Sequence, residues 1–469
     1  MARSVFAYLW GFLGKLGPQI ISLATMFVLA RFLSPDDFGQ IAVLTIFTAV
    51  AQTLFEAGLG GSLVKEKNPT PIDFSTIFVF NISVSAFLYI VIFLCAPLIE
   101  DYFQLPGLAT ICRLLSLAFV INSWGLVAFT VLYRELKFKT LTYSSLISFI
   151  VGGATGIATA VWLEWGVYSL VAYQLTQNLV YVGRNWFVCR YRCSFRFSAA
   201  SFRKLFSFGF FTTVANVVET AYEHVITIFF GRYLGISQAG LLSQAQRIQT
   251  ASVSSFTGTV NAVAFPLLTP LRDDAAAFRS EADKLLRTLS LSVLPLLMTI
   301  ALFAEFLMVF LFGEQWRESA PYLRILMWVG CFFVLESANR TFIKSLARVH
   351  ALLGVTLIKR ALGLLLMGVA IMIDRDWLLY AFLGGSIIGY LANAVVYVRI
   401  TSLPLLPYLG KTLFYLLIPS LLYLAGVAIN HCVSSTLIQL PVWTALLAAY
   451  YLLLLPRLGI RLLALLRKN

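Results

Sequence analysis

Several ionisable side chains lie within long apolar stretches of the chain, where a charge is costly and usually faces a protein interior or an aqueous cavity. These residues are Lys15, Arg113, Arg247 and Arg340 among the cations, and Glu219 and Glu223 among the acids. Cations around a cavity attract an anionic group such as a pyrophosphate, and adjacent carboxylates share a proton or bind a cation. The pattern predicts binding of a charged solute inside a membrane.

Glu219 and Glu223 are one helical turn apart, so both side chains can face the same cavity. Glu219 lies near the middle of its apolar stretch. One interpretation is coupling to a proton or another cation. The alternative is that both acids pair with Arg247 on the neighbouring segment and hold two helices together. The spacing alone leaves both interpretations open.

A second charged group follows helical spacing near residue 340. Glu336 and Arg340 are four residues apart and are expected to neutralise each other. Lys344 and Arg348 follow Arg340 at intervals of four residues and form a basic stripe with it. The stripe either lines a cavity and attracts an anionic headgroup, or its side chains extend to the membrane surface. Lys15 is the strongest single candidate for a cavity cation, because nine further residues separate it from the start of its apolar segment.

No catalytic or metal-binding pattern occurs in the sequence. A nucleophile elbow, a phosphate loop and a metal-ligand spacing are all missing. Cys189 and Cys193 are four apart but have no histidine or second cysteine pair beside them. No cofactor is expected. The formal charge of +14 is concentrated in short loops, which is typical of membrane orientation signals and not of nucleic-acid binding.

The elements that position these charges are predicted to be membrane-spanning helices. Hydrophobic residues make up 60% of the 469 residues and charged residues only 12%, and mean hydropathy is +0.87. Each crossing needs about 20 mostly apolar residues. Spans are predicted at 6–30, 39–63, 74–98, 108–132, 141–163, 166–188, 206–230, 240–268, 288–312, 322–346, 350–373, 377–398, 412–430 and 440–455. The fold class is thus an all-α membrane protein of about fourteen helices, with twelve or thirteen left open.

Loop charges alternate along the chain and predict its orientation. One set of loops is rich in cations, for example 134–139 and 190–204, whereas the opposite set is poor in them and contains Glu164 and Glu314. Because cation-rich loops stay in the cytoplasm, both termini are predicted to be cytoplasmic. No loop exceeds about 20 residues, so a soluble domain is not expected.

Two short similarities indicate an internal repeat. Arg31-Phe32-Leu33 is followed by Gly39, and Arg232-Tyr233-Leu234 is followed by Gly240 at the same offset. The second similarity is between Arg113-Leu114-Leu115 and Arg324-Ile325-Leu326, where the fourth and tenth predicted spans begin. Both similarities map the first six spans onto the next six in parallel orientation, which is a known transporter arrangement. The predicted division is a six-helix lobe at 1–200, a second six-helix lobe at 201–400, and two additional helices with a basic cytoplasmic tail at 401–469.

The order of several motifs resembles that of a known family. Leu29-Ala30-Arg31-Phe32-Leu33-Ser34-Pro35-Asp36-Asp37-Phe38-Gly39 is similar to a first-loop signature of bacterial polysaccharide transporters. Gly231-Arg232-Tyr233-Leu234-Gly235 and Leu311-Phe312-Gly313, with Trp316 following, are similar to later motifs of the same proteins. The chain resembles the lipid-linked oligosaccharide flippases (Wzx type) of the MOP superfamily over nearly its whole length. One departure is the apolar run 225–230, where many members carry an acid.

The resemblance implies export of an undecaprenyl-pyrophosphate-linked repeat unit across a bacterial inner membrane, by rocking of two lobes around a cationic cavity. It implies Lys15, Arg31, Arg113, Arg247 and Arg340 as headgroup contacts, and Glu219 and Glu223 as ion-coupling residues. The implied partners are the lipid-linked oligosaccharide, membrane lipid, a proton or sodium ion, a polysaccharide polymerase and a chain-length regulator. The glycan would serve O-antigen, capsule or exopolysaccharide.

Three other functions are weighed against this one. A drug or metabolite antiporter of the same superfamily would favour an acidic cavity, whereas the buried charges here are mostly basic. A lipid II flippase has a similar charge pattern and is not separated by it. A membrane glycan polymerase or ligase would need large outer loops, and the longest outer loop, near 313–320, is short.

Overall fold

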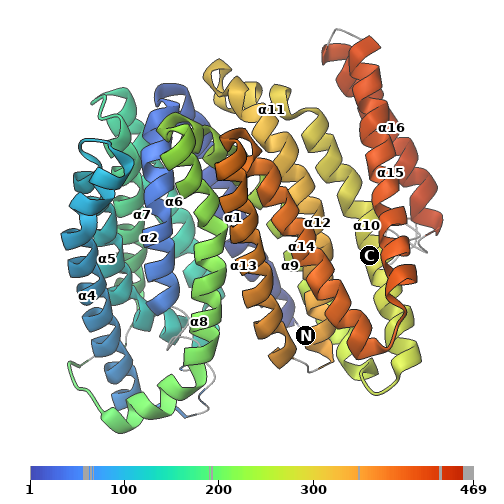
Figure 1. Cartoon of the computed structure of the whole chain (residues 1–469). Helices are drawn as coiled ribbons and strands as arrows, with labels where there is room; N and C mark the ends of the chain where they lie inside the picture. The colour runs from blue at the N-terminus through green and yellow to red at the C-terminus, as the bar shows by residue number, and fades with distance from the viewer. Residues whose placement is uncertain are drawn as a thin grey trace. The chain divides into compact units, whose positions relative to one another are not determined.

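The computed structural model describes residues 2–55, 63, 66, 68–189, 191, 194–346, 349–432 and 436–457. Within these ranges all regular elements are helices and no strand occurs (Figure 1). Nine of the described helices are long and apolar enough to cross a membrane, judged by length and composition. The predicted all-α membrane fold is therefore confirmed, and the helix order is compatible with fourteen crossings.

The chain forms two compact units. The first unit contains Met1–Ser243 and Leu311–Gln315. Its helices are α1 (Ala2–Phe32), α2 (Pro35–Phe55), α4 (Pro71–Phe103), α5 (Leu108–Arg134), α6 (Phe138–Val161), α7 (Val167–Val188), α8 (Ala199–Phe229) with a π-helical turn at Phe230–Leu234, and the start of α9 (Ile236–Leu268).

The second unit contains Gln244–Phe310 and Trp316–Asn469. Its helices are the remainder of α9, α10 (Ala275–Leu302), α11 (Ala304–Phe312), α12 (Ala320–Ser345), α13 (Val349–Ile373), α14 (Leu378–Thr401), α15 (Leu405–Cys432) and α16 (Thr436–Arg457). Short 3-10 turns precede α10, α12 and α14.

The start of α2 is fixed by the residues of the first-loop motif. The Ser34 hydroxyl accepts a hydrogen bond from the Asp37 backbone N–H at 3.3 Å. The Asp37 carboxylate in turn accepts the Ser34 backbone N–H at 2.9 Å. Such a reciprocal cap satisfies two helix-terminal donors, and Pro35 occupies the first helical position, where its missing N–H costs nothing. This motif is therefore a helix-start signal as well as a family signature.

Two glycines bring α2 and α9 into backbone contact. A Cβ on Gly39 would lie 2.0 Å from the Ile236 carbonyl oxygen, and a Cβ on Gly240 would lie 1.9 Å from the Pro35 carbonyl oxygen. Each glycine is four residues after the start of its own helix and contacts the first residue of the other helix, so the contact is reciprocal. No other residue type fits at either position, because the neighbouring atoms belong to the backbone and not to a flexible side chain.

The helix in this region begins earlier than the sequence predicts. The predicted span is 288–312, with residues 269–284 as a loop, whereas α10 begins at Ala275. Asp274 caps α10 by accepting the N–H groups of Ala276 and Ala277 at 3.0 Å each, and the following alanines favour a helix. The same predicted span is interrupted at Phe303, where α10 ends and α11 begins. The start of α10 therefore extends beyond the apolar part of the sequence.

Candidate functional site: charged groups within the two units

The first two predicted headgroup contacts belong to α1. Lys15 lies within this helix, and its side chain is outside the described part of the structure. Arg31 lies in the last turn of α1, where its side chain is exposed. A cation there complements the negative helix end. The adjoining carbonyl groups of Ala30 and Leu33 accept hydrogen bonds from the Gln315 side-chain amide at 2.5 and 3.1 Å, so this end of α1 is held by the 311–315 segment.

Arg113 lies on α5 against α4. Its guanidinium group sits over the Phe93 ring, 4.3 Å from the centroid, and its Nε donates to the Phe93 carbonyl oxygen at 3.3 Å. A cation over an aromatic face is stabilised by the ring quadrupole. The side chain is half-buried. These contacts within the unit therefore offset part of the desolvation cost of placing the Arg113 charge in an apolar helix.

Glu219 and Glu223 occupy α8, as the helical spacing required. Glu219 is half-buried and Glu223 is exposed. Next to Glu219, the hydroxyl oxygens of Thr220 and Thr53 lie 3.1 Å apart and share a hydrogen bond, which links α8 to α2. This polar side of α8 carries both acids within one turn. Carboxylates one helical turn apart are of the kind that can bind a cation or share a proton.

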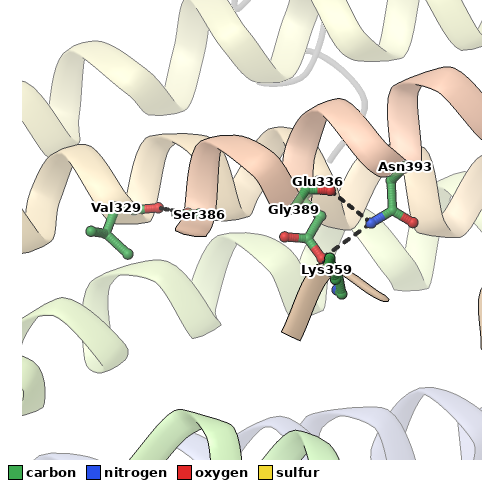
Figure 2. A network of polar contacts seen from close by, with 6 residues as sticks. All are labelled: Val329, Glu336, Lys359, Ser386, Gly389 and Asn393. Atoms are coloured by element: carbon green, nitrogen blue, oxygen red, sulfur yellow. Dashed lines mark hydrogen bonds and ion pairs between the residues drawn. The ribbon is translucent and has the colours of Figure 1, made fainter. Parts of the chain in front are cut away.

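The second unit contains a buried ion pair that joins two helices. Lys359 of α13 donates its Nζ to the Glu336 carboxylate of α12, and their side chains are only 1% and 2% exposed. Asn393 of α14 donates its Nδ2 to the same carboxylate at 3.3 Å. Figure 2 shows the three side chains converging from three helices. The cluster therefore connects α12, α13 and α14 through one neutralised charge pair.

A glycine makes room for this cluster. A Cβ on Gly389 would lie 2.7 Å from a Glu336 carboxylate oxygen, and the Gly389 carbonyl oxygen accepts the Asn393 Nδ2 at 3.0 Å. One turn earlier on α14, the Ser386 hydroxyl donates to the Val329 carbonyl oxygen at 3.2 Å (Figure 2). These contacts hold α14 against α12 on both sides of the carboxylate. Breaking one partner of such a buried pair is strongly destabilising.

The remaining two predicted cations are half-buried in this unit. Arg247 lies on α9 and Arg340 on α12. Glu336, which the helical spacing placed with Arg340, is bonded to Lys359 in the structure. The helical spacing groups Glu336 with Arg340 and gives no indication that Glu336 contacts another helix. The sequence feature that could have predicted the Glu336–Lys359 contact is Lys359 itself, because a lysine deep inside an apolar segment requires an acidic partner.

The second unit contains a partly open space at one end. A cavity of about 330 Å³ lies between α10, α12, α14 and the first turn of α15. Its charged lining residues are Arg279, Asp283 and Lys411. None of the seven predicted site residues lines it. In the part of the chain that is described, no group of three or more His, Cys, Asp or Glu side chains is arranged to hold a metal ion.

Comparison with known proteins identifies the family. The model of the polysaccharide biosynthesis protein family matches residues 28–321, more than half of the chain. The lipopolysaccharide biosynthesis protein WzxC of Escherichia coli K12 is 25% identical over 334 residues, covering 70% of this chain and 67% of WzxC. The succinoglycan biosynthesis transport protein ExoT of Rhizobium meliloti is 29% identical over 321 residues, covering 68% of this chain and 64% of ExoT.

Solved structures establish the fold independently of sequence. The lipid II flippase MurJ, in an inward closed conformation, matches with a TM-score of 0.75 at 14% identity, covering 96% of this chain and 99% of MurJ. An inward-facing multidrug resistance MATE transporter of the MOP superfamily matches with a TM-score of 0.65 at 12% identity, covering 83% of this chain and 98% of that transporter. Because the sequence identities are this low, the similarity to these structures shows the fold alone.

These comparisons agree with the family resemblance that the sequence motifs indicate. The chain is a multi-pass membrane transport protein that belongs to the polysaccharide biosynthesis protein family and has the fold of the MOP superfamily.

Proposed function

We propose that this protein flips undecaprenyl-pyrophosphate-linked oligosaccharide repeat units from the inner to the outer leaflet of a bacterial inner membrane. The observation that carries the proposal is the family match over residues 28–321. The relatives WzxC and ExoT are named as proteins of lipopolysaccharide biosynthesis and of succinoglycan biosynthesis transport. Both pathways build a polysaccharide, and the second name specifies transport. The glycan product is O-antigen, capsule or exopolysaccharide.

The proposed mechanism is alternating access by two lobes, 1–200 and 201–400, with 401–469 peripheral. The reciprocal contact of Gly39 and Gly240 supports it, because both glycines occupy the same place in the repeat. Equivalent residues of two parallel repeats meet in this way when an axis along the membrane normal relates them. Rocking about such an axis would separate α2 and α9 at one stage of the cycle.

The proposed headgroup contacts are Lys15, Arg31, Arg113, Arg247 and Arg340. A pyrophosphate carries several negative charges, and basic side chains in a low-dielectric cavity bind it by charge-assisted hydrogen bonds. Arginines suit this task because their planar donor fork matches phosphate oxygens. The partial burial of Arg113, Arg247 and Arg340 supports a role inside the membrane and not at its surface.

The proposed coupling residues are Glu219 and Glu223. Their carboxylates would bind a proton or sodium ion in one state and release it in the other, so the ion gradient drives the cycle. The buried Glu336 is a weaker candidate, because Lys359 already neutralises it. The proposed partners in the cell are a polysaccharide polymerase and a chain-length regulator, which act on the exported units.

Deletion of the gene in its host tests the proposal. The expected result is loss of one surface polysaccharide and accumulation of its lipid-linked repeat unit on the cytoplasmic side, both restored by the intact gene. Unchanged polysaccharide combined with increased sensitivity to cationic drugs would contradict the proposal. That outcome would assign the protein to drug efflux, which the likeness to the MATE fold makes the leading alternative.

A further inference from the structure

The cavity at the end of the second unit has the features of an anion-binding pocket. Its charged wall consists of Arg279 and Asp283 on α10 and Lys411 on α15, whereas its apolar wall includes Leu286, Phe342 and Pro404. A volume of about 330 Å³ lies at the lower end of the range for small-molecule sites. This space is separate from every residue proposed above for substrate or ion.

Arg279 is the uncompensated charge of the pocket. Lys411 and Asp283 pair with each other at 3.2 Å, which leaves the guanidinium group of Arg279 without a carboxylate partner among the described residues. Its Nη2 donates to the Thr401 carbonyl oxygen at the end of α14. Its Nε is buried and has no hydrogen-bond acceptor within the described part of the chain. A buried donor without an acceptor is costly, and an oxygen of a bound anion would satisfy it.

The backbone around the pocket also favours an anion. Residues Pro404, Pro407 and Tyr408 belong to the first turn of α15 or precede it, and they line the space. The N-terminal end of a helix carries partial positive charge. Tyr408 is fixed by two contacts: its ring centroid lies 5.5 Å from that of Tyr397 on α14, and its hydroxyl donates to the Asn339 side-chain oxygen at 2.5 Å.

The apolar surface beside the pocket indicates that its ligand is a lipid. Starting next to Pro407, α15 presents a stripe of exposed large hydrophobic side chains: Leu406, Leu413, Phe414, Leu417, Leu421 and Leu424. Acyl chains of a lipid whose phosphate occupies the pocket would run along this stripe. The sequence at this end is rich in cations, including Arg272 in the turn before α10 and Lys284 on α10 itself, which predicts the cytoplasmic leaflet.

We infer that Arg279 and Lys411 form a binding site for the phosphate of an anionic glycerophospholipid from the cytoplasmic leaflet. The phosphate accepts hydrogen bonds from the Arg279 Nε and from the free donors of the Lys411 ammonium, which makes only one bond to Asp283. The glycerol and the first methylenes contact Leu286, Leu403 and Pro404. Basic pockets between helices on the cytoplasmic side are a recognised place for lipid headgroups.

The test is binding of dioctanoyl phosphatidylglycerol to the purified, detergent-solubilised protein, with bound lipid counted by native mass spectrometry and affinity measured by titration. The expected result is one saturable site whose affinity falls about tenfold or more in Arg279→Gln, since a charge-assisted hydrogen bond is lost. Arg279→Lys, which keeps the charge but lacks the Nε donor, should bind with intermediate affinity. Lys284→Gln is the matched control: its exposed side chain pairs with Glu281 on the same helix and does not line the pocket.

Each other outcome has a definite meaning. Equal affinity of Arg279→Gln and the wild type, or an equal loss in Lys284→Gln, would overturn the site. Glycerol 3-phosphate binding as tightly as the lipid would replace it with a site for free phosphate. Tighter binding of undecaprenyl phosphate would assign the pocket to the carrier. If Arg279→Gln does not fold, Lys411→Gln tests the same pocket, because Lys411 is exposed and holds no helix end.

Discussion

The Glu336–Lys359 pair places two charges where both side chains are almost fully buried, 2% and 1% exposed, between two largely apolar helices. Each charge is tolerated because the other neutralises it, and Asn393 satisfies a further acceptor site on the carboxylate. An isolated charge at such a position would cost several kcal/mol. The cluster therefore determines which faces of α12, α13 and α14 pack against each other.

Removing one partner of the pair should destabilise the second unit. Glu336→Gln and Lys359→Met are each expected to lower the free energy of unfolding by about 3–5 kcal/mol, because a buried charge is left uncompensated. The double substitution should recover much of this loss. Thermal denaturation in detergent measures the effect, with Lys284→Gln as the exposed control. Single variants as stable as the control would show that the pair is not buried in the folded protein.

Lys15 is the proposed headgroup contact that most directly tests the cationic cavity. Lys15→Ala is expected to reduce export about tenfold or more while membrane insertion is unchanged, since a charge-assisted contact to phosphate is lost. Export is measured as surface polysaccharide per inserted protein. The control is Lys137→Ala, whose side chain is 45% exposed and pairs with Glu135. Normal export by well-inserted Lys15→Ala would remove Lys15 from the site.

At the scale of elements, helices could be predicted from the sequence because apolar runs of about 20 residues have few alternatives in a membrane. Contacts between helices could not. Glu336 and Arg340 are neighbours by helical spacing, but Lys359 lies on another helix, and no local pattern specifies that approach. The start of α10 was missed for a related reason: Ala275 to Lys284 is helical by capping and propensity, whereas the span prediction followed hydropathy.

The contact between α2 and α9 depends on two glycines and makes a prediction for that pair of helices. Gly39→Ala and Gly240→Ala should each destabilise the protein by about 1–3 kcal/mol, because the new Cβ meets a backbone oxygen and the helices must separate. Gly183→Ala on α7 is the control, since nothing lies within 4 Å of its Cβ. Melting temperatures of the purified variants compare the three. Wild-type stability of both Gly39→Ala and Gly240→Ala would argue against the close crossing.

For the whole molecule, the distribution of loop charges predicts which side of the membrane each loop faces. Alkaline phosphatase fused after Glu164 should be active, because this cation-poor loop is expected outside. The same enzyme fused after Leu136 should be inactive, since the loop there carries Arg134, Lys137 and Lys139. Activity assays on cells expressing each fusion give the answer. The reverse pattern would invert the orientation and place both termini outside.

The central claim is that the protein moves a lipid-linked oligosaccharide between leaflets, and its most direct test is a flipping assay in proteoliposomes. The purified protein is reconstituted with an undecaprenyl-pyrophosphate oligosaccharide, and a proton or sodium gradient is imposed. We expect gradient-dependent appearance of the glycan on the opposite face, reduced in Glu219→Gln and Glu223→Gln. Absence of flipping by folded protein under either gradient, together with efflux of small cationic dyes, would contradict it.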